Sequence, residues 1–176
     1  TLKHFPGHGD TLEDSHAGTA TSTKTWEEMK AVELLPFEAG IAAGADVVMA
    51  AHITTPNATE DGLPASLSYT ILTERLRGEL GFTGVICTDG LGMKAITDHY
   101  SPAEAAIAAL DAGADLLLLP ADLQEAFDGV VAAVESGRIS EERLDESVRR
   151  ILTLKEKADL SLRASTPADT LLDRLS

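Results

Sequence analysis

The feature that most constrains this fold is a set of short, uninterrupted apolar runs. They occupy residues 47–51, 85–87 and 116–119, and a glycine lies shortly before each of them. Each run has the length of a strand, and hydrophobicity without alternation is typical of parallel strands buried on both faces by helices. The sequence therefore predicts an α/β fold built on a parallel sheet.

Helical signals separate these runs. Thr25 with Glu28, and Ser101 with Glu104, have the spacing of a capping box, in which two side chains bond each other's backbone N–H groups. Pro102 suits the first turn of the second of these helices. The sequence predicts helices over 25–43, 69–80, 101–112, 123–136 and 140–158.

The tetrapeptide Ala-Gly-Ala-Asp occurs at 43–46 and again at 112–115, each time at the end of a predicted helix and before an apolar run. This internal repeat indicates successive βα units, either in an open sheet or in a (β/α)₈ barrel. With the short apolar start of the chain as a further strand, there are about four βα units, half the number in such a barrel.

Charge and composition exclude several classes of partner. The 176 residues carry 14 Lys and Arg against 29 Asp and Glu, a formal net charge of −15, which argues against nucleic acid or an anionic membrane as a partner. No apolar run approaches the roughly 18 residues of a membrane span. A single cysteine, Cys87, excludes a disulfide framework and a cysteine-based zinc site, and we expect its side chain to be packed in the core.

The two ends of the sequence lead to predictions about its boundaries. The first residue is Thr and not Met, so we expect the native N-terminus to lie upstream, and cytoplasmic, secreted and lipid-anchored locations all stay open. We expect one folded unit over 1–160 and a C-terminal tail over 161–176, where Pro, Thr, Ser and Asp are frequent.

Histidines and acidic residues gather near the start of the chain. Pro6 and Gly7 forbid a helix there, so this segment is either a solvated turn or a ligand-binding loop after a strand. A metal site is a rival interpretation. Imidazoles four positions apart converge on one ion only in a helix, and because no helix is expected here, we expect no metal site. The candidate residues are Lys3, His4, His8, Asp10, Asp14 and His16.

Asp14 and His16 are spaced for a dyad. In an extended loop, residues two positions apart project the same way, so the carboxylate can bond one ring nitrogen and leave the other facing a substrate. Such a pair makes His16 a usable general acid and base. The alternative is that Asp14 only orders its own turn.

Two further candidates follow predicted strands. Asp89 ends the strand at 85–88, before small and apolar residues, as expected if it lines a pocket; an Asp that only caps the following turn is the alternative. His52 follows the strand at 47–51 and is either a pocket contact, which its position favours, or a hydrogen-bonded histidine of the core.

Taken in order, the segments 3–10, 14–16, 49–52 and 88–93 resemble the β-N-acetylhexosaminidases of glycoside hydrolase family 3. The resemblance extends to about residue 158. It implies a (β/α)₈ TIM-type barrel of which this chain is the second half, beginning in the fifth strand. It also implies a partner that completes the barrel, either the first half of the protein or a second copy of this chain.

The resemblance further implies roles for single residues. Asp89 stands where the family has its catalytic nucleophile, and His16 with Asp14 matches the acid/base dyad of the N-acetylglucosaminidase branch. Lys3 and His4 match the pair that holds sugar hydroxyls, and the weaker substrate-binding candidates are His8, Asp10 and His52.

The implied reaction is the removal of terminal β-linked N-acetylglucosamine from peptidoglycan- or chitin-derived sugars, with retention and without a metal or cofactor. Three alternatives stay open: phosphorolysis at the same site, a non-catalytic sugar-binding fragment, and a metallohydrolase that uses His4, His8, Asp10 and His52.

Overall fold

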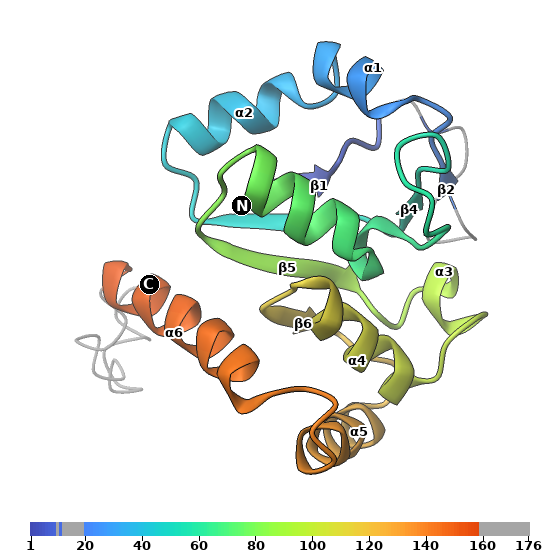
Figure 1. The fold of residues 1–176 in the computed structure, drawn as a ribbon, viewed down its shortest axis with the longest axis vertical. Helices are drawn as coiled ribbons and strands as arrows, with labels where there is room; N and C mark the ends of the chain where they lie inside the picture. The colour runs from blue at the N-terminus through green and yellow to red at the C-terminus, as the bar shows by residue number, and fades with distance from the viewer. Residues whose placement is uncertain (10, 12–19, 159–176) are drawn as a thin grey trace, which may run out of the picture.

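The computed structural model describes residues 1–9, 11 and 20–158 (Figure 1). A parallel four-stranded sheet forms its centre, in the order β1-β3-β5-β6, so strands that follow one another in this series are also neighbours in space. This confirms the predicted parallel α/β fold and is consistent with part of a barrel. The strands are β1 (Leu2–Phe5), β3 (Val47–Ala50), β5 (Val85–Gly90) and β6 (Leu116–Leu118).

A smaller parallel pair, β2 (Ala20–Thr21) with β4 (Ile53–Thr54), adjoins this sheet. In the described part of the chain, no helix is both long enough and apolar enough to cross a bilayer. The helices are α1 (Trp26–Ala31), α2 (Leu35–Ala42), the 3₁₀ helix η1 (Ala65–Leu67), the π-type helix η2 (Thr70–Glu79), α3 (Lys94–Thr97), α4 (Pro102–Ala112), α5 (Leu123–Glu135) and α6 (Glu141–Lys157).

Both predicted capping boxes are present, at the starts of α1 and α4. The single helix predicted over 25–43 is wrong, because the chain turns between α1 and α2. The Leu34 N–H closes α1 on the carbonyl of Met29 at 2.9 Å. Pro36 explains the break: inside a continuous helix its ring would clash with the preceding turn, whereas in the first turn of α2 it is tolerated.

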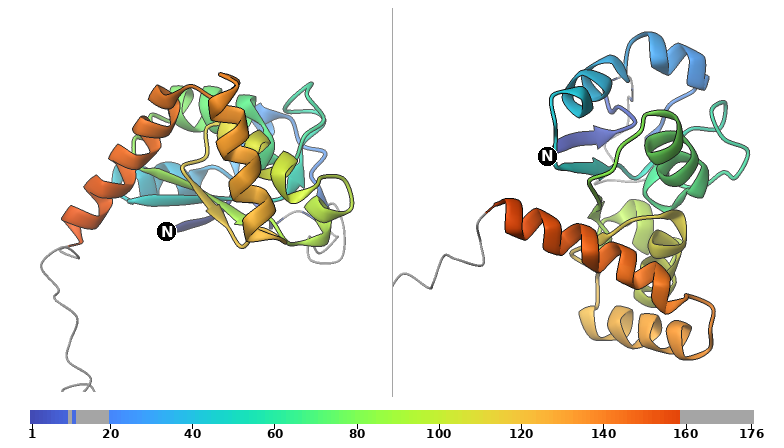
Figure 2. Two further views of the ribbon diagram at one scale, coloured as in Figure 1. Left: turned by 90° about the horizontal axis from the view of Figure 1, so that it is seen from below. Right: turned by 60° about the vertical axis from the view of Figure 1, so that its left-hand side comes forward.

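The helices wrap round one side of the sheet (Figure 2). On that side Val48, Ala50 and Ile86 are completely buried in the main apolar core. Val47 and Met49, which alternate with them in β3, are only partly buried. The expectation of burial on both faces is therefore wrong for β3. It is also wrong for the edge strand β6, where Leu116 is 38% exposed. Strand β5 meets the expectation, because Val85, Ile86, Cys87 and Thr88 are all buried.

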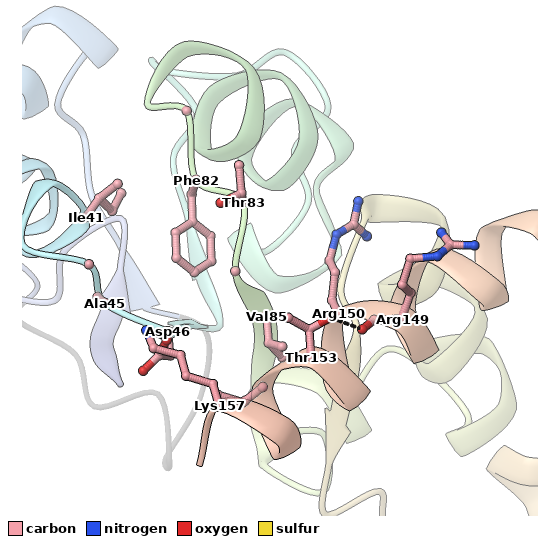
Figure 3. Close-up of a pocket in the computed structure, with 14 residues that line it drawn as sticks. Ile41, Ala45, Asp46, Phe82, Thr83, Val85, Arg149, Arg150, Thr153 and Lys157 are labelled. Carbon is pink, nitrogen blue, oxygen red and sulfur yellow. Dashed lines mark hydrogen bonds and ion pairs between the residues drawn. The ribbon is translucent and has the colours of Figure 1, made fainter. Parts of the chain in front are cut away.

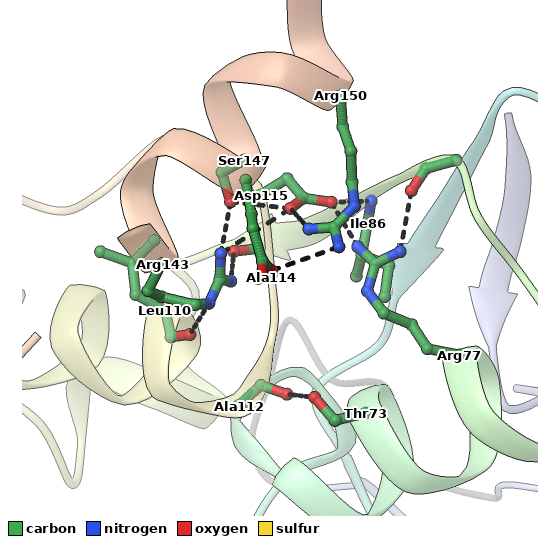
Figure 4. Close-up of polar contacts among 12 residues, drawn as sticks. Thr73, Arg77, Ile86, Leu110, Ala112, Ala114, Asp115, Arg143, Ser147 and Arg150 are labelled. Atoms are coloured by element: carbon green, nitrogen blue, oxygen red, sulfur yellow. Dashed lines mark hydrogen bonds and ion pairs between the residues drawn. The ribbon is translucent and has the colours of Figure 1, made fainter. Parts of the chain in front are cut away.

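A buried carboxylate ties four elements together at the N-terminal ends of the strands (Figure 4). Asp115 Oδ2 accepts hydrogen bonds from Arg77 of η2 at 2.5 Å and from the Ile86 N–H of β5 at 2.9 Å. Its Oδ1 accepts from Ser147 at 2.7 Å and from Arg150 at 3.1 Å, both on α6. Burial lowers the pKa of the Arg77 guanidinium and the Asp115 charge opposes that effect, so Arg77 remains a cation.

The Ala-Gly-Ala-Asp repeat is confirmed as a structural repeat. Gly44 and Gly113 have φ of 85° and 111° just after α2 and α4, and φ values in this range favour glycine. The two aspartates precede β3 and β6, and both bind α6. Asp115 binds Ser147 and Arg150 of this helix, and Asp46 Oδ1 accepts from Lys157 at 2.5 Å. Helix α6 thus crosses this end of the sheet and holds two strand starts.

A cavity of about 470 Å³ lies beside α6 at the same end (Figure 3). Asp46, Phe82 and Val85 line it from the sheet side, and Arg149, Thr153 and Lys157 line it from α6. Because Asp89 lies near the C-terminal end of β5, this cavity is at the opposite end of the sheet. In barrel folds that N-terminal end serves stability and the C-terminal end carries the chemistry.

Candidate active site

The sequence candidates that the structure describes gather at the C-terminal ends of the strands. Asp89 is the penultimate residue of β5, His4 is in β1, and His52 follows β3. Because these strands are parallel, their C-terminal ends meet at one edge of the sheet, where α/β enzymes place their ligands.

Asp89 and His4 approach each other across an intervening strand. Asp89 Oδ2 lies 3.8 Å from His4 Nε2, and the two side chains are 17% and 32% exposed. Strands β1 and β5 are both neighbours of β3, so their backbones are about 9.6 Å apart at the usual strand spacing. The side chains can therefore meet only by leaning toward each other over β3, at the rim of the sheet.

The other oxygen of Asp89 is held by the backbone, because the Gly90 N–H donates to Oδ1 at 2.8 Å. One carboxylate oxygen is thus fixed and the second faces an imidazole that is partly open to solvent. This arrangement suits a nucleophile that must keep one orientation toward a bound substrate.

The loop after β1 contributes polar groups beside this pair. His8 Nδ1 lies 2.5 Å from the Thr11 hydroxyl, and the rings of His4 and His8 are 6.2 Å apart, nearly perpendicular. Gly7 has φ of 138°, and a Cβ there would lie 2.8 Å from the Cβ of Glu33, so glycine lets the loop pack closely.

A cavity of about 580 Å³ opens between this loop and the segment that joins α1 to α2. Its polar lining combines cations, imidazoles and one carboxylate, and Lys24 forms an ion pair with Glu33. Donors and acceptors of this kind suit a polyhydroxylated ligand. The charged and imidazole lining residues are Lys3, His4, His8, Lys24 and Glu33.

His52 is completely buried, with its ring between β5 and η1. Its Nε2 lies 2.9 Å from the carbonyl oxygen of Gly90, and its Nδ1 lies 2.7 Å from the Ser66 hydroxyl. Of the two alternatives raised by the sequence, this geometry favours the hydrogen-bonded core histidine. His52 can reach a ligand only indirectly, through the backbone next to Asp89.

Cys87 is buried, as expected, and its thiol donates to the Thr88 carbonyl at 3.1 Å. Burial raises the pKa of the thiol, and the negative charge of Asp89 adds to the increase. The thiol therefore stays protonated at neutral pH and is a poor nucleophile.

Three candidates lie outside the described residues: Asp10, Asp14 and His16. The predicted boundary at residue 160 lies outside them as well. Among residues 1–9, 11 and 20–158, no group of three or more His, Cys, Asp or Glu side chains is placed to hold a metal ion.

Sequence reasoning missed two polar groups of this region. Ser66 partners His52, and Thr88 Oγ1 accepts from the Leu118 N–H at 3.1 Å, which fixes β5 to β6. Ser66 belongs to no motif or periodic pattern, and Thr88 opens the segment 88–93 without a predicted role of its own. Only the tertiary pairing of distant segments reveals them.

Comparison with known proteins shows the family of the chain. The sequence profile described as the glycosyl hydrolase family 3 N-terminal domain matches residues 1–154. A β-hexosaminidase of Stenotrophomonas maltophilia (strain R551-3) is 46% identical over 132 residues, which cover 74% of this chain and 39% of that protein.

Two solved structures are also similar. A glycoside hydrolase family 3 β-N-acetylglucosaminidase from Paenibacillus sp. str. FPU-7 has a TM-score of 0.89 and 47% identity, covering 93% of this chain and 32% of that one. A β-glucoside phosphorylase has a TM-score of 0.86 and 33% identity, covering 93% and 31%. The chain therefore spans only 31% to 39% of the length of these relatives.

Proposed function

The chain belongs to glycoside hydrolase family 3, and from that premise we propose that it carries the nucleophile half of a retaining β-N-acetylhexosaminidase site. The substrate class is a terminal β-linked N-acetylglucosamine on peptidoglycan- or chitin-derived sugars. The observation that carries this proposal is the placement of Asp89, with one oxygen held by Gly90 and the other facing His4.

The proposed mechanism is a double displacement. The Asp89 carboxylate attacks the anomeric carbon while His16, oriented by Asp14, protonates the departing glycosidic oxygen. The resulting glycosyl ester on Asp89 is then attacked by water, which gives its proton to His16, and Asp89 leaves as the carboxylate. We expect His16 to come within about 5 to 5.5 Å of Asp89 in a substrate complex, the spacing typical of retaining enzymes.

Lys3 and His4 are proposed to hold sugar hydroxyls, with His8 and Asp10 as further contacts. His4 is already within reach of both Asp89 and the polar cavity, so it can orient the ring relative to the attacking oxygen. No metal or cofactor has a part in these steps.

Phosphorolysis is a second candidate, favoured by the similarity to the β-glucoside phosphorylase. In this variant phosphate attacks the glycosyl ester in place of water, the C–O bond to Asp89 breaks, and a sugar 1-phosphate leaves. A histidine acid/base tolerates an anionic acceptor better than a carboxylate would, because it adds no like charge.

We propose that polypeptide outside this chain completes the substrate pocket. The sheet described here has four strands, with β1 and β6 at its edges, whereas a closed barrel of this class has eight. The first half of the protein is the proposed source, and a second copy of this chain is the alternative.

The test is release of nitrophenol from an aryl β-N-acetylglucosaminide by the native polypeptide that carries these residues, with and without phosphate. The variants are Asp89→Ala and His16→Ala, with the exposed Asp98→Ala and His99→Ala as matched controls. We expect both site variants to lose at least about a thousandfold in kcat, a barrier increase of about 4 kcal/mol, and both controls to keep full activity.

Each outcome has a consequence. Turnover that requires phosphate and yields a sugar 1-phosphate would establish the phosphorylase. Sugar binding without turnover would establish a binding fragment, and activity lost in chelator and restored by zinc would establish a metallohydrolase. Full activity in Asp89→Ala would overturn the site.

A further inference from the structure

We propose that His52 is a positioning residue for the Asp89 nucleophile, acting through the backbone of Gly90. This inference rests on the proposed function of Asp89. It gives His52 a role although its ring is shielded from any ligand. The two contacts share Gly90. His52 Nε2 lies 2.9 Å from Gly90 O, and the Gly90 N–H donates to Asp89 Oδ1 at 2.8 Å.

The direction of each hydrogen bond follows from the partners. A backbone carbonyl can only accept, so Nε2 must carry a proton and donate to Gly90 O. In the neutral ring, Nδ1 then accepts from the hydroxyl of Ser66. Ser66 is itself completely buried, and its N–H donates to the Ala51 carbonyl at 3.0 Å, so the far end of this relay is anchored to the chain just after β3.

The relay acts at a point where β5 has lost its regular pairing. The register with β6 shifts between Cys87 and Gly90, next to the nucleophile. On the β6 side, the Leu91 N–H donates to the Leu118 carbonyl at 2.8 Å, and the Gly90 carbonyl also accepts from the Met93 N–H at 3.0 Å. The imidazole supplies a further hydrogen bond to the Gly90 carbonyl from the β3 side, in a completely buried position where such bonds are strong.

Loss of the bond between His52 and Gly90 should affect the chemical step more than substrate binding. The Gly90 carbonyl and the Gly90 N–H belong to the two peptide groups that flank the Gly90 Cα. If the backbone at Gly90 rotates when the bond from His52 is lost, the N–H moves away from Asp89 Oδ1 and the carboxylate gains rotamer freedom. A misplaced nucleophile lowers kcat, whereas the sugar contacts at Lys3 and His4 that set KM stay in place.

A pair of variants separates this role from simple packing. In His52→Gln the side-chain amide reaches the position of Nε2 and can still donate to Gly90 O. In His52→Asn the amide reaches only the position of Nδ1, so the bond to Ser66 can be kept while the bond to Gly90 is lost. We expect His52→Gln to keep kcat within about tenfold and His52→Asn to lose a further factor of about ten to a hundred, with KM changed less than about threefold.

Trapping by a 2-deoxy-2-fluoro glycoside provides a direct readout of the nucleophile. Mass spectrometry of the labelled protein gives the rate at which Asp89 forms its glycosyl ester. We expect that rate to follow kcat, with wild type and His52→Gln fast and His52→Asn slow. Equal trapping rates in the two variants, or a parallel change in kcat and KM, would overturn the positioning role.

A second measurement needs no turnover and so separates this inference from the proposed function. Amide hydrogen exchange of Gly90 reports how firmly its N–H is held, and the Ile86 amide, which bonds Asp115, is an internal control. We expect His52→Asn to speed exchange at Gly90 and leave Ile86 unchanged, and His52→Gln to change neither. Equal acceleration at both amides would mean a general loss of stability and would refute the relay, even if the protein proves to be a glycosidase.

Discussion

His4 and Asp89 face each other from strands that are not neighbours, with Nε2 and Oδ2 3.8 Å apart above β3. That separation is too long for a hydrogen bond and short enough for a sugar hydroxyl to contact both groups. Under the proposed function, the pair would orient the sugar ring relative to Asp89.

Replacing His4 by Ala should lower kcat/KM by about ten- to a hundredfold, the value of one hydrogen bond to a charged or polarised group. The loss comes from orientation, since Asp89 stays in place. Steady-state kinetics on the aryl glycoside measures it, and the exposed His99→Ala is the matched control. Unchanged kinetics in His4→Ala would remove His4 from the site.

The thiol of Cys87 should report the charge of Asp89. Its pKa is raised first by burial and then by the neighbouring carboxylate, so Asp89→Asn should lower it while the effect of burial remains. Thiolate absorbance at 240 nm, followed against pH, gives the midpoint. An unchanged midpoint in Asp89→Asn would show that the two groups do not interact.

The same shift makes stability depend on pH. Between the pKa of the thiol in the unfolded chain and its higher pKa in the folded protein, the folded state keeps a proton that the unfolded state has lost. The free energy of unfolding should therefore fall as pH rises through that window. Urea unfolding at several alkaline pH values tests this, and Cys87→Ser should show a smaller slope.

Asp115→Asn should destabilise the fold by about 3 to 5 kcal/mol, because it removes a completely buried carboxylate and leaves partly buried guanidinium groups without their counter-charge. Urea unfolding at neutral pH measures the loss. The control is Asp111→Asn, whose partner is Arg138; these side chains are 44% and 62% exposed, and such a pair contributes about 0 to 1 kcal/mol. Equal effects of the two substitutions would contradict the importance assigned to the buried cluster.

The two repeat glycines should respond differently to alanine. Gly44 has open space around the position of a Cβ. Gly44→Ala should therefore lower the free energy of unfolding only through the strain of alanine in a left-handed backbone conformation, about 1 to 2 kcal/mol. At Gly113 a Cβ would lie 2.4 Å from Thr73 Oγ1, which donates to the Ala112 carbonyl at 2.8 Å. We expect Gly113→Ala to lower the free energy of unfolding, measured by thermal unfolding, by about 1 to 3 kcal/mol more than Gly44→Ala does. A difference near zero between the two variants would mean that Thr73 can move aside.

Local signals in the sequence predicted local structure well. The capping boxes at Thr25 and Ser101 and the glycine ends of α2 and α4 depend on residues a few positions apart, and all are confirmed. The break between α1 and α2 could also have been predicted, since Pro36 carries the signal by itself.

Features that depend on distant partners could not be predicted. His52 and Gly90 are 38 positions apart, and Arg77 and Asp115 are also 38 apart. Periodicity says nothing about such pairs. The same applies to the run 116–119, which looks like an interior strand. Leu116 is 38% exposed in β6, which lies at an edge of the described sheet, and Leu119 comes after the end of β6.

Helix α6 is made after the strands whose starts it holds. Lys157 and Asp46 are 111 positions apart in the chain, and Asp115 also waits for Ser147 and Arg150 of the same helix. Long-range contacts of this kind slow folding, because the intervening chain must be ordered first. While α6 is still being synthesised, the aspartates before β3 and β6 lack these partners, so the N-terminal ends of these strands are held only after the last described helix has been made.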